Sequence, residues 1–209
     1  MARITTYTCK LCRREGEKLF LKGARCLSSK CSLTRRAYAP GVHGPGRPGR
    51  PTDYGKQLRE KQKAKRLYGL SETQFANYYK KSVKTKGDSG VTLVKLLETR
   101  FDNVIFRSGL AKSRAAARQL VTHSHFTING RKVNVPSFQV KSGQVIAVQE
   151  RKHKAAPWTT MSEDLKGHQA PSWLSTDPSN LSVKVTSQPA GEELKQSFEP
   201  KLIIEYYSR

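Results

Sequence analysis

The sequence has few acidic residues. Its 209 residues include 39 Lys and Arg but only 16 Asp and Glu, giving a formal net charge of +23 and a pI near 10.2. No acid occurs between Asp102 and Glu150. A surplus of this size opposes compaction through self-repulsion, and an ordinary solvated surface mixes both signs of charge. The composition therefore predicts a polyanionic partner, either nucleic acid or an anionic membrane surface.

Long apolar runs and nucleotide-binding loops are also missing. No stretch approaches the roughly 18 apolar residues of a membrane-spanning helix, and MARITTYTCK has no signal-peptide core. The phosphate-binding pattern GxxxxGK[ST] does not occur. We therefore expect a cytoplasmic chain with no membrane partner and no small-molecule substrate.

The positive charge is concentrated in the first three quarters of the chain. Residues 1–66 hold 18 Lys and Arg against 4 Asp and Glu, and residues 67–160 hold 16 against 5. Residues 161–209 hold 5 against 7. The polyanion is therefore predicted to contact the first two regions, and the last must have another role.

Cysteine is scarce, and all four cysteines lie within residues 1–36. Thiols of a cytoplasmic chain stay reduced, which favours metal or redox chemistry over a disulfide framework. The spacing is Cys9-x2-Cys12, thirteen residues, then Cys26-x4-Cys31. Two close thiolate pairs separated by a loop can close a four-sulfur site, so we expect Zn²⁺. An iron–sulfur cluster is the alternative ligand, and two disulfides or unrelated buried thiols stay open.

The N-terminal half predicts an extended arm and two helices. Residues 37–52 are rich in Pro, Gly and Arg, which disfavours helix and strand. A helix is predicted from Thr52 or Asp53 to Tyr68, ended by Gly69. The pattern SETQ, which begins at Ser71, is a capping box that opens a second helix. Residues 80–90 are predicted to be a linker and the main domain boundary.

Three more helices and a hairpin follow. The predicted helices are Thr92–Arg100, Asn103–Arg107 and Arg114–His123, the last capped by Ser113. Asn129-Gly130 between two alternating runs predicts a tight hairpin.

The rest of the chain predicts strands and loops. Residues 138–148 suggest a second strand pair turning at Ser142-Gly143. Residues 151–200 are loop-rich, with a short strand near 181–185 and with Trp158 and Trp173 as packing anchors. The ending KLIIEYYSR is predicted to be a final strand that returns to the N-terminal helices.

The segment Ser113–Val135 carries the strongest functional pattern. Arg114 and Arg118 are four residues apart and share a helix face. The N-terminus of that helix favours phosphate, and the hairpin adds Arg131 and Lys132. Duplex RNA presents phosphates and 2′-hydroxyls, so the arrangement suits a folded RNA backbone.

These residues resemble a known family. SRAAARQLVTHSHFTINGRKV, preceded by LETRFDNVIFRSGLAK, is similar to the RNA-binding domain of the fourth protein of the small ribosomal subunit. TCKLCRREG, PGVHG, DYGKQLREKQKAKRLYGLSETQF and IIEYYSR resemble the flanks of the bacterial-type ribosomal family in its four-cysteine form. The resemblance covers residues 1–148 and 200–209 and is loose over 151–199.

The resemblance implies an α+β fold. A mainly helical N-terminal domain with the four-Cys metal site would carry an inserted RNA-binding domain of helices packed on a small antiparallel sheet. The expected divisions are residues 1–51 for the metal site and basic arm, 52–91 with 200–209 for the helical domain, and 92–199 for the RNA-binding domain.

The resemblance also implies a function. The chain would be a structural constituent of the small subunit that binds 16S ribosomal RNA, nucleates assembly of the subunit body and supports translational accuracy. It would lie where mRNA enters and contact the fifth small-subunit protein. The alternative is an RNA-modifying enzyme or an RNA-binding regulator with the same module. The sequence shows no large second domain with a catalytic Asp, so no catalytic residue is expected.

Candidate RNA contacts follow from the resemblance and from the charge pattern. Positions that match the family motif are Arg100, Asn103, Arg107, Lys112, Ser113, Arg114, Arg118, Gln119, His123 and Arg131. Further candidates are Lys132 of the hairpin and, in the N-terminal half, Arg13, Arg14, Arg35, Arg36, His43, Arg47, Arg50, Lys56, Arg59, Lys63 and Arg66.

Overall fold

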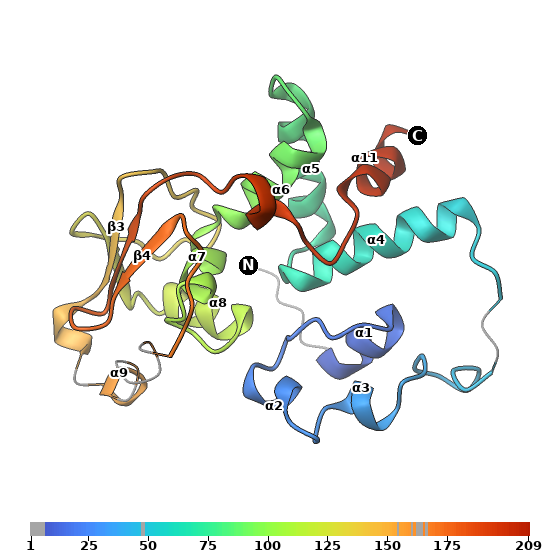
Figure 1. Ribbon diagram of the computed structural model, residues 1–209, viewed down its shortest axis with the longest axis horizontal. Coiled ribbons are helices and arrows are strands. Elements are labelled where there is room, and N and C mark those ends of the chain that lie inside the picture. Colours follow the sequence, from blue (N-terminus) through green and yellow to red (C-terminus); the bar gives the residue numbers. More distant parts are fainter. Residues whose placement is uncertain (1–6, 47–48, 154, 160, 162–164, 166) are drawn as a thin grey trace. The chain divides into compact units, whose positions relative to one another are not determined.

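The computed structural model describes residues 7–46, 49–153, 155–159, 161, 165 and 167–209. The chain divides into two compact units, residues 1–94 with 196–209 (unit 1) and residues 95–195 (unit 2) (Figure 1). Each unit is described by itself below. The three-part division expected from the sequence stays a prediction. Among the described residues, every helix is too short or too polar to cross a bilayer.

Unit 1 begins with three short helices around the cysteines. They are α1 (Thr8–Glu15), α2 (Ala24–Leu27) and α3 (Ser32–Arg35). Gly16 ends α1 in the left-handed region at φ +75°. The side chains of Leu19 and of three cysteines are buried among these helices, so this segment has a very small core of its own.

Capping residues fix the ends of the next two helices as predicted. Helix α4 (Asp53–Leu67) begins where the Thr52 hydroxyl accepts from the Gly55 N–H at 3.2 Å. It ends before Gly69, whose φ of +63° only glycine adopts readily. Helix α5 (Glu72–Lys84) opens with the Ser71 hydroxyl accepting from the Gln74 N–H at 3.3 Å.

The predicted linker over 80–90 is too long, because helices occupy both of its ends. Helix α5 continues to Lys84, and α6 (Ser89–Glu98) starts three residues before the predicted Thr92. The Asp88 carboxylate accepts from the Gly90 N–H at 2.7 Å, which caps the new start.

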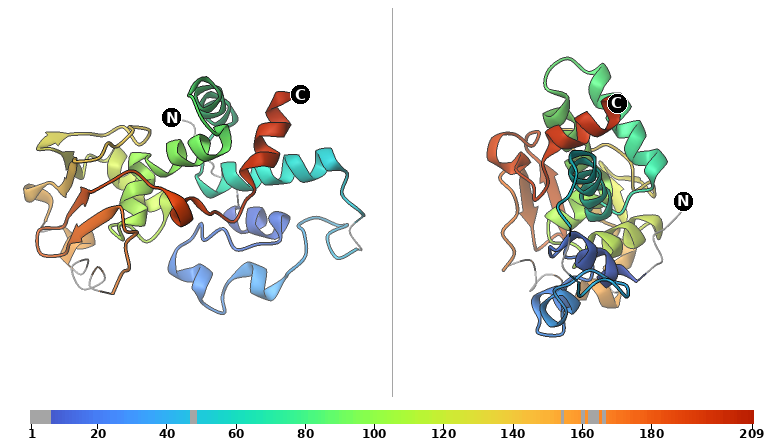
Figure 2. Two further views of the ribbon diagram at one scale, coloured as in Figure 1. Left: turned by 45° about the horizontal axis from the view of Figure 1, so that its top comes forward. Right: turned by 90° about the vertical axis from the view of Figure 1, so that its right-hand side faces the viewer.

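The predicted C-terminal strand is wrong, because Pro200–Ser208 forms helix α11. Isoleucine and tyrosine favour strands, but in α11 Ile203 is buried and two tyrosines contact other helices. Tyr206 lies 5.7 Å from the Tyr54 ring of α4, and Tyr207 stacks 4.7 Å from the Tyr79 ring of α5. Helix α11 therefore packs against α4, which confirms the predicted return to the N-terminal helices (Figure 2).

An ion cluster reinforces the same junction. The Glu72 carboxylate accepts from Lys61 at 2.8 Å, from Lys65 at 2.8 Å and from the Tyr207 hydroxyl at 2.7 Å. Burial would raise the pKa of Glu72, but these three hydrogen bonds lower it to about 2. The carboxylate is therefore charged at neutral pH and ties α4, α5 and α11 together.

Unit 2 packs two helices on an antiparallel sheet. Helices α7 (Phe101–Arg107) and α8 (Arg114–Thr122) contact each other beside the sheet (Figure 1). The strand order is β2-β1-β3-β5-β4. The strands are β1 (Phe126–Ile128), β2 (Arg131–Lys132), β3 (Val145–Val148), β4 (Leu174–Asp177) and β5 (Ser182–Val185).

The predicted hairpin is confirmed. Asn129 and Gly130 take φ of +48° and +80°, and Ile128 lies opposite Arg131. These positive φ values are those of a two-residue primed turn, which matches the twist of the flanking strands. The Asn129 side-chain oxygen also accepts from the Val145 N–H at 2.8 Å, which joins the turn to β3.

The predicted strand pair within 138–148 is wrong. Strand β3 pairs with β1 and β5, and Gln139 forms only an isolated bridge with Arg100. Pairing with β1 places Ile146 and Val148 in the core beside Phe126. A local hairpin would forgo that burial.

The C-terminal part of unit 2 is more ordered than its composition suggests. Besides β4 and β5, it has α9 (Ala156–Thr159) and the single turns η1 (Glu150–Lys152) and η2 (Gly191–Leu194). Trp158 and Trp173 are each 2 % exposed, which confirms them as packing anchors. The Trp158 ring meets the Phe126 ring edge-on at 5.5 Å. The segment therefore supplies much of the unit's core.

One core contact depends on protonation. The Trp158 indole N–H donates to His125 Nδ1 at 3.1 Å, so that nitrogen must be unprotonated. Burial, followed by the charges of Lys152 and His123, lowers the pKa of His125 below its ordinary 6.5.

We expect His125 to make unfolding easier in mild acid. Below about pH 6.5 the unfolded histidine binds a proton that the folded one resists, so the unfolded state binds more protons. Its contribution is present above that pH and is lost below it. Urea unfolding at pH 7.5 and 5.5 measures the change. In His125→Gln, whose amide oxygen can still accept from Trp158, the drop should be smaller; equal drops would contradict this account.

Candidate nucleic-acid interface

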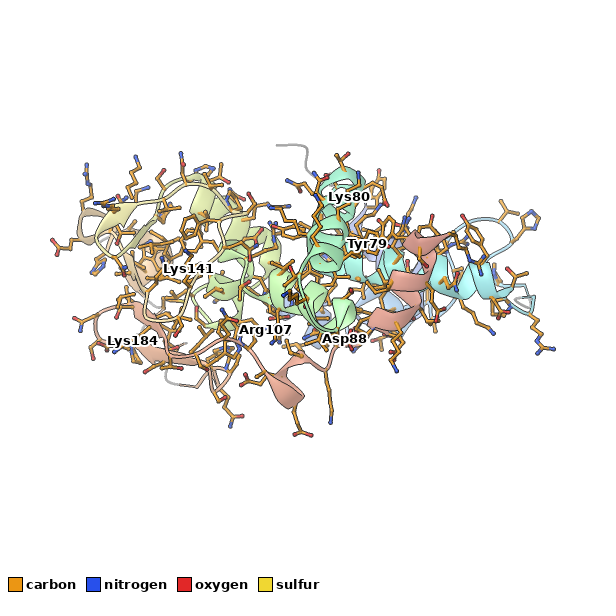
Figure 3. All side chains as sticks on the ribbon, turned by 90° about the horizontal axis from the view of Figure 1, so that it is seen from above. Tyr79, Lys80, Asp88, Arg107, Lys141 and Lys184 are labelled. Carbon is orange, nitrogen blue, oxygen red and sulfur yellow. The ribbon has the colours of Figure 1, made fainter. Side chains whose placement is uncertain are left out.

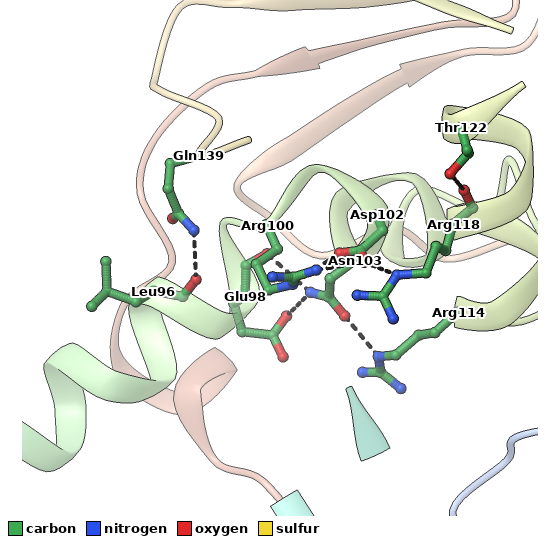
Figure 4. A network of polar contacts seen from close by, with 9 residues as sticks. All are labelled: Leu96, Glu98, Arg100, Asp102, Asn103, Arg114, Arg118, Thr122 and Gln139. Carbon is green, nitrogen blue, oxygen red and sulfur yellow. Dashed lines mark hydrogen bonds and ion pairs between the residues drawn. The ribbon is translucent and has the colours of Figure 1, made fainter. Parts of the chain in front are cut away.

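Two buried carboxylates, Glu98 of α6 and Asp102 of α7, form hydrogen bonds or ion pairs with several of the predicted RNA-contact residues. Glu98 is 2 % exposed, and its carboxylate accepts from Arg107 Nε at 3.0 Å and Nη2 at 2.8 Å. It also accepts from Asn103 Nδ2 at 2.8 Å (Figure 4). Glu98 and Arg107 therefore form a bidentate ion pair, and the Arg107 side chain is still 31 % exposed.

Asp102 neutralises two arginines. It accepts from Arg100 Nε at 3.0 Å and Nη2 at 2.7 Å, and Arg118 Nε lies 3.3 Å away (Figure 4). The Arg100 side chain is 0 % exposed. Arg100 therefore stabilises the interior, and its expected contact with RNA is not compatible with this burial. Sequence alone could not distinguish it from the exposed arginines.

Asn103 and Ser113 also support the fold rather than face outward. Asn103 is 1 % exposed, and its side-chain oxygen accepts from Arg114 Nε at 2.8 Å. The guanidinium of Arg114 lies 4.5 Å from the centre of the Phe106 ring. The Ser113 hydroxyl caps α8 by accepting from the Ala116 N–H at 3.2 Å. These contacts restrict Arg114 and so reduce the entropy lost when it binds a partner.

The other predicted contacts of unit 2 lie at the surface. The exposed residues are Lys112, Gln119, His123, Arg131 and Lys132. They come from α8, the turn before it and the hairpin, and residues 103–149 contain no acid. Lys141 and Lys184 were not among the predicted contacts but are also exposed in this unit (Figure 3). Alternation along β5 was the available signal for Lys184, because Val183 and Val185 on either side of it are buried.

In unit 1 some of the predicted RNA-contact residues are exposed, and others bind groups of the protein itself. The exposed ones are Arg14, Arg35, Arg36, His43, Arg50 and Lys56. Arg13 donates to the Tyr38 carbonyl at 3.0 Å, while Arg59 and Arg66 pair with Glu15. Arg47 lies outside the described residues.

Lys63, another predicted RNA contact, is also buried. It is 7 % exposed, and its ammonium lies 3.1 Å from both Glu17 and Glu60 and donates to the Ser197 carbonyl at 2.9 Å. Three acceptors satisfy the ammonium, so an RNA phosphate has no access to it without rearrangement. The periodicity of α4 indicated a charged face here, but partners from distant segments cover it.

The four cysteines are free thiols, and three of them are buried. Burial raises the pKa of Cys12, and the neighbouring thiols Cys26, Cys9 and Cys31 raise it further. Burial also disfavours the Cys31 thiolate, but the N–H groups of Leu33 and Thr34 lower its pKa overall. Among the described residues, no group of three or more His, Cys, Asp or Glu is arranged to hold a metal ion.

A basic helix pair and hairpin packed on an antiparallel sheet define an RNA-binding module. The family model described as "S4 domain" matches residues 99–146, and "Ribosomal protein S4/S9 N-terminal domain" matches residues 3–98. Proteins named "Small ribosomal subunit protein uS4" from Acetivibrio thermocellus and Clostridioides difficile are each 49% identical over 209 residues. The one from Natranaerobius thermophilus is 48% identical over 209 residues. All three alignments span 100% of both chains. The chain belongs to the uS4 family of small ribosomal subunit proteins.

We expect Asp102→Asn to destabilise the protein strongly. The change removes the carboxylate charge that faces the fully buried Arg100 guanidinium, and removing one partner of a buried ion pair typically costs about 3–5 kcal/mol. Chemical unfolding of the whole chain measures the loss. Asp53→Asn is the matched control, because the Asp53–Lys56 pair is exposed to solvent and should contribute little to stability. Similar losses in both variants would contradict the role assigned to Asp102.

Proposed function

We propose that this chain is a structural, non-catalytic constituent of the small ribosomal subunit that binds 16S ribosomal RNA directly. The observation that carries the proposal is the identity of 48% to 49%, over the full length, with proteins named as that constituent. The match to both family domains supports it. An RNA-modifying enzyme with the same module is not favoured, because these relatives carry the ribosomal name over their whole length.

Phosphate contacts made by exposed cations would supply most of the affinity. Each Lys or Arg that neutralises a phosphate releases condensed counterions, so binding weakens as salt rises. Arg131 and Lys132 of the hairpin and Lys112 before α8 are exposed for this role. Arg107, Arg114 and Arg118 are held in place by Glu98, Asn103 and Asp102, which orients their guanidinium groups before RNA arrives.

Finer parts of the proposal rest on the family resemblance. They are nucleation of the subunit body, a contribution to translational accuracy, and contact with the fifth small-subunit protein and with mRNA where it enters. The charge distribution supports RNA on the first three quarters of the chain. Co-sedimentation with small subunits that persists until high salt would test the ribosomal location.

We expect Arg131→Ala with Lys132→Ala to weaken binding to 16S ribosomal RNA. The slope of log affinity against log salt should become shallower by about 0.7–0.9 for each lost phosphate contact. Filter binding from 50 to 300 mM salt measures both quantities. This pair tests the surface more cleanly than Arg114 and Arg118, whose replacement also breaks internal contacts.

A matched control separates this site from general charge loss. Lys195→Ala with Lys201→Ala removes the same charge from the exposed C-terminal part. The control should keep wild-type affinity and slope. If the hairpin variant binds like wild type, or if both variants weaken equally, the hairpin is not the contact surface.

We also propose that the four cysteines bind Zn²⁺, with an iron–sulfur cluster as the alternative. The spacing of the two Cys pairs supports it, and three of the four thiols are buried within one small segment. The bound ion would supply the cohesion that so small a core lacks. Cys9, Cys12, Cys26 and Cys31 would be the ligands, all as thiolates.

We expect Cys9→Ser to release the metal and loosen residues 7–36 without unfolding residues 95–195. Metal analysis of reduced native protein should find one zinc per chain, whereas an iron–sulfur cluster would give visible absorbance. Hydrogen exchange locates the loosened segment. Native protein that contains neither zinc nor iron would refute the metal proposal.

A further inference from the structure

A pocket opens beside α8 within unit 2. Its volume is about 470 Å³, which lies in the range of sites for small organic groups. The lining residues are Ala111, Lys112, Ala116, Gln119, Leu120, His123, His125 and Met161. Four of these are apolar and four are polar, and none is acidic. The pocket therefore suits a group with an apolar surface and polar or negatively charged substituents.

The pocket occupies a separate face of α8. Ala116, Gln119, Leu120 and His123 follow the spacing i, i+3, i+4 and i+7, so they form one stripe along the helix. Arg114 and Arg118 belong to another face, and buried Ala117 and Val121 define the face toward the core. A partner on the exposed side of α8 can thus meet arginines on one flank and the pocket on the other.

One wall of the pocket is fixed by the core. His125 accepts a hydrogen bond from the buried Trp158, and the two rings lie 5.7 Å apart at 48°. Its lowered pKa keeps the imidazole neutral at pH 7. Met161 adds a polarisable thioether, which packs well against aromatic rings. A neutral ring and a sulfur atom make this wall suitable for a flat aromatic group.

The rim of the pocket overlaps the candidate RNA interface. Lys112, Gln119 and His123 line the pocket and are also positions where the family motif predicts RNA contact. A nucleotide would place its base in the apolar part and a phosphate near Lys112. An apolar side chain from a protein would gain nothing from that cation. The shared residues therefore favour a nucleotide over a protein segment.

We infer that this pocket receives one unpaired nucleobase of the bound ribosomal RNA, while Lys112 contacts an adjacent phosphate. The inference rests on the proposed function and deepens it, because it adds recognition of a base to contacts with the backbone. Proteins that bind structured RNA commonly recognise bases in single-stranded loops and bulges, where a base can leave its stack.

Filling the pocket tests the inference without changing charge. Ala116→Leu should weaken binding to 16S ribosomal RNA roughly tenfold, within the range expected for one lost base contact. The salt slope should stay as in wild type, because no phosphate contact is removed. Ala190→Leu, the same change at an exposed position of unit 2 outside the pocket, is the matched control and should bind normally. Circular dichroism checks that all three proteins are folded.

A crosslink tests the occupant without any change of fold. The sequence has two methionines, Met1 and Met161. Photo-methionine incorporated into the whole chain should therefore crosslink residue 161 to a nucleobase in assembled small subunits. Met161→Leu removes that crosslink and leaves any crosslink from residue 1.

The outcomes separate the two proposals. If Ala116→Leu binds like wild type, or if residue 161 crosslinks to a protein or to nothing, the base pocket is overturned and the proposed function stands. Failure of the wild-type chain to bind 16S ribosomal RNA would overturn both.

Discussion

Buried carboxylates make this cationic fold possible. In unit 2, Asp102 faces Arg100 and Arg118, and Glu98 faces Arg107. Both acids are almost fully buried, so they neutralise arginines inside the protein and add little negative charge outside. Such pairs contribute modestly to net stability, because desolvation offsets much of their attraction. Their more useful effect here is orientation, since the surface that remains from residue 103 to 149 is free of acids.

Ion pairs with buried members also explain how α4 packs, although its sequence DYGKQLREKQKAKRL is rich in Lys and Arg. Lys61 and Lys63 are 4 % and 7 % exposed, so their aliphatic stems add apolar surface to the helix interface. Their ammonium groups meet Glu72 in one case and Glu17 and Glu60 in the other. Carboxylates on α4 itself and on other segments thus make these two lysines cross-links of unit 1, although Lys63 was predicted to contact RNA.

Local signals in the sequence predicted local structure well. The caps Thr52 and Ser71 and the Asn129-Gly130 turn act within a few residues, so the chain determines them without tertiary help. Features that depend on distant partners were missed. Strand β4 was not predicted, and α11 was expected as a strand because its packing against α4 overrides the preference of Ile and Tyr. The candidate site shows the same difference. Arg131 and Lys132 of the locally determined hairpin are exposed, as an RNA contact requires, whereas the burial of Arg100 and Lys63 depends on acids in their surroundings.

The segment beyond residue 146 completes the module as well as the sheet. The S4-domain match ends there, just after the start of β3. Without later residues, the edge of β3 would lack its partner β5 and Phe126 would lose the cover of Trp158. The same segment contributes Met161 to the pocket beside α8. Because one stretch closes the core and shapes that pocket, the geometry offered to RNA depends on how the C-terminal part of unit 2 folds onto the basic helix–hairpin.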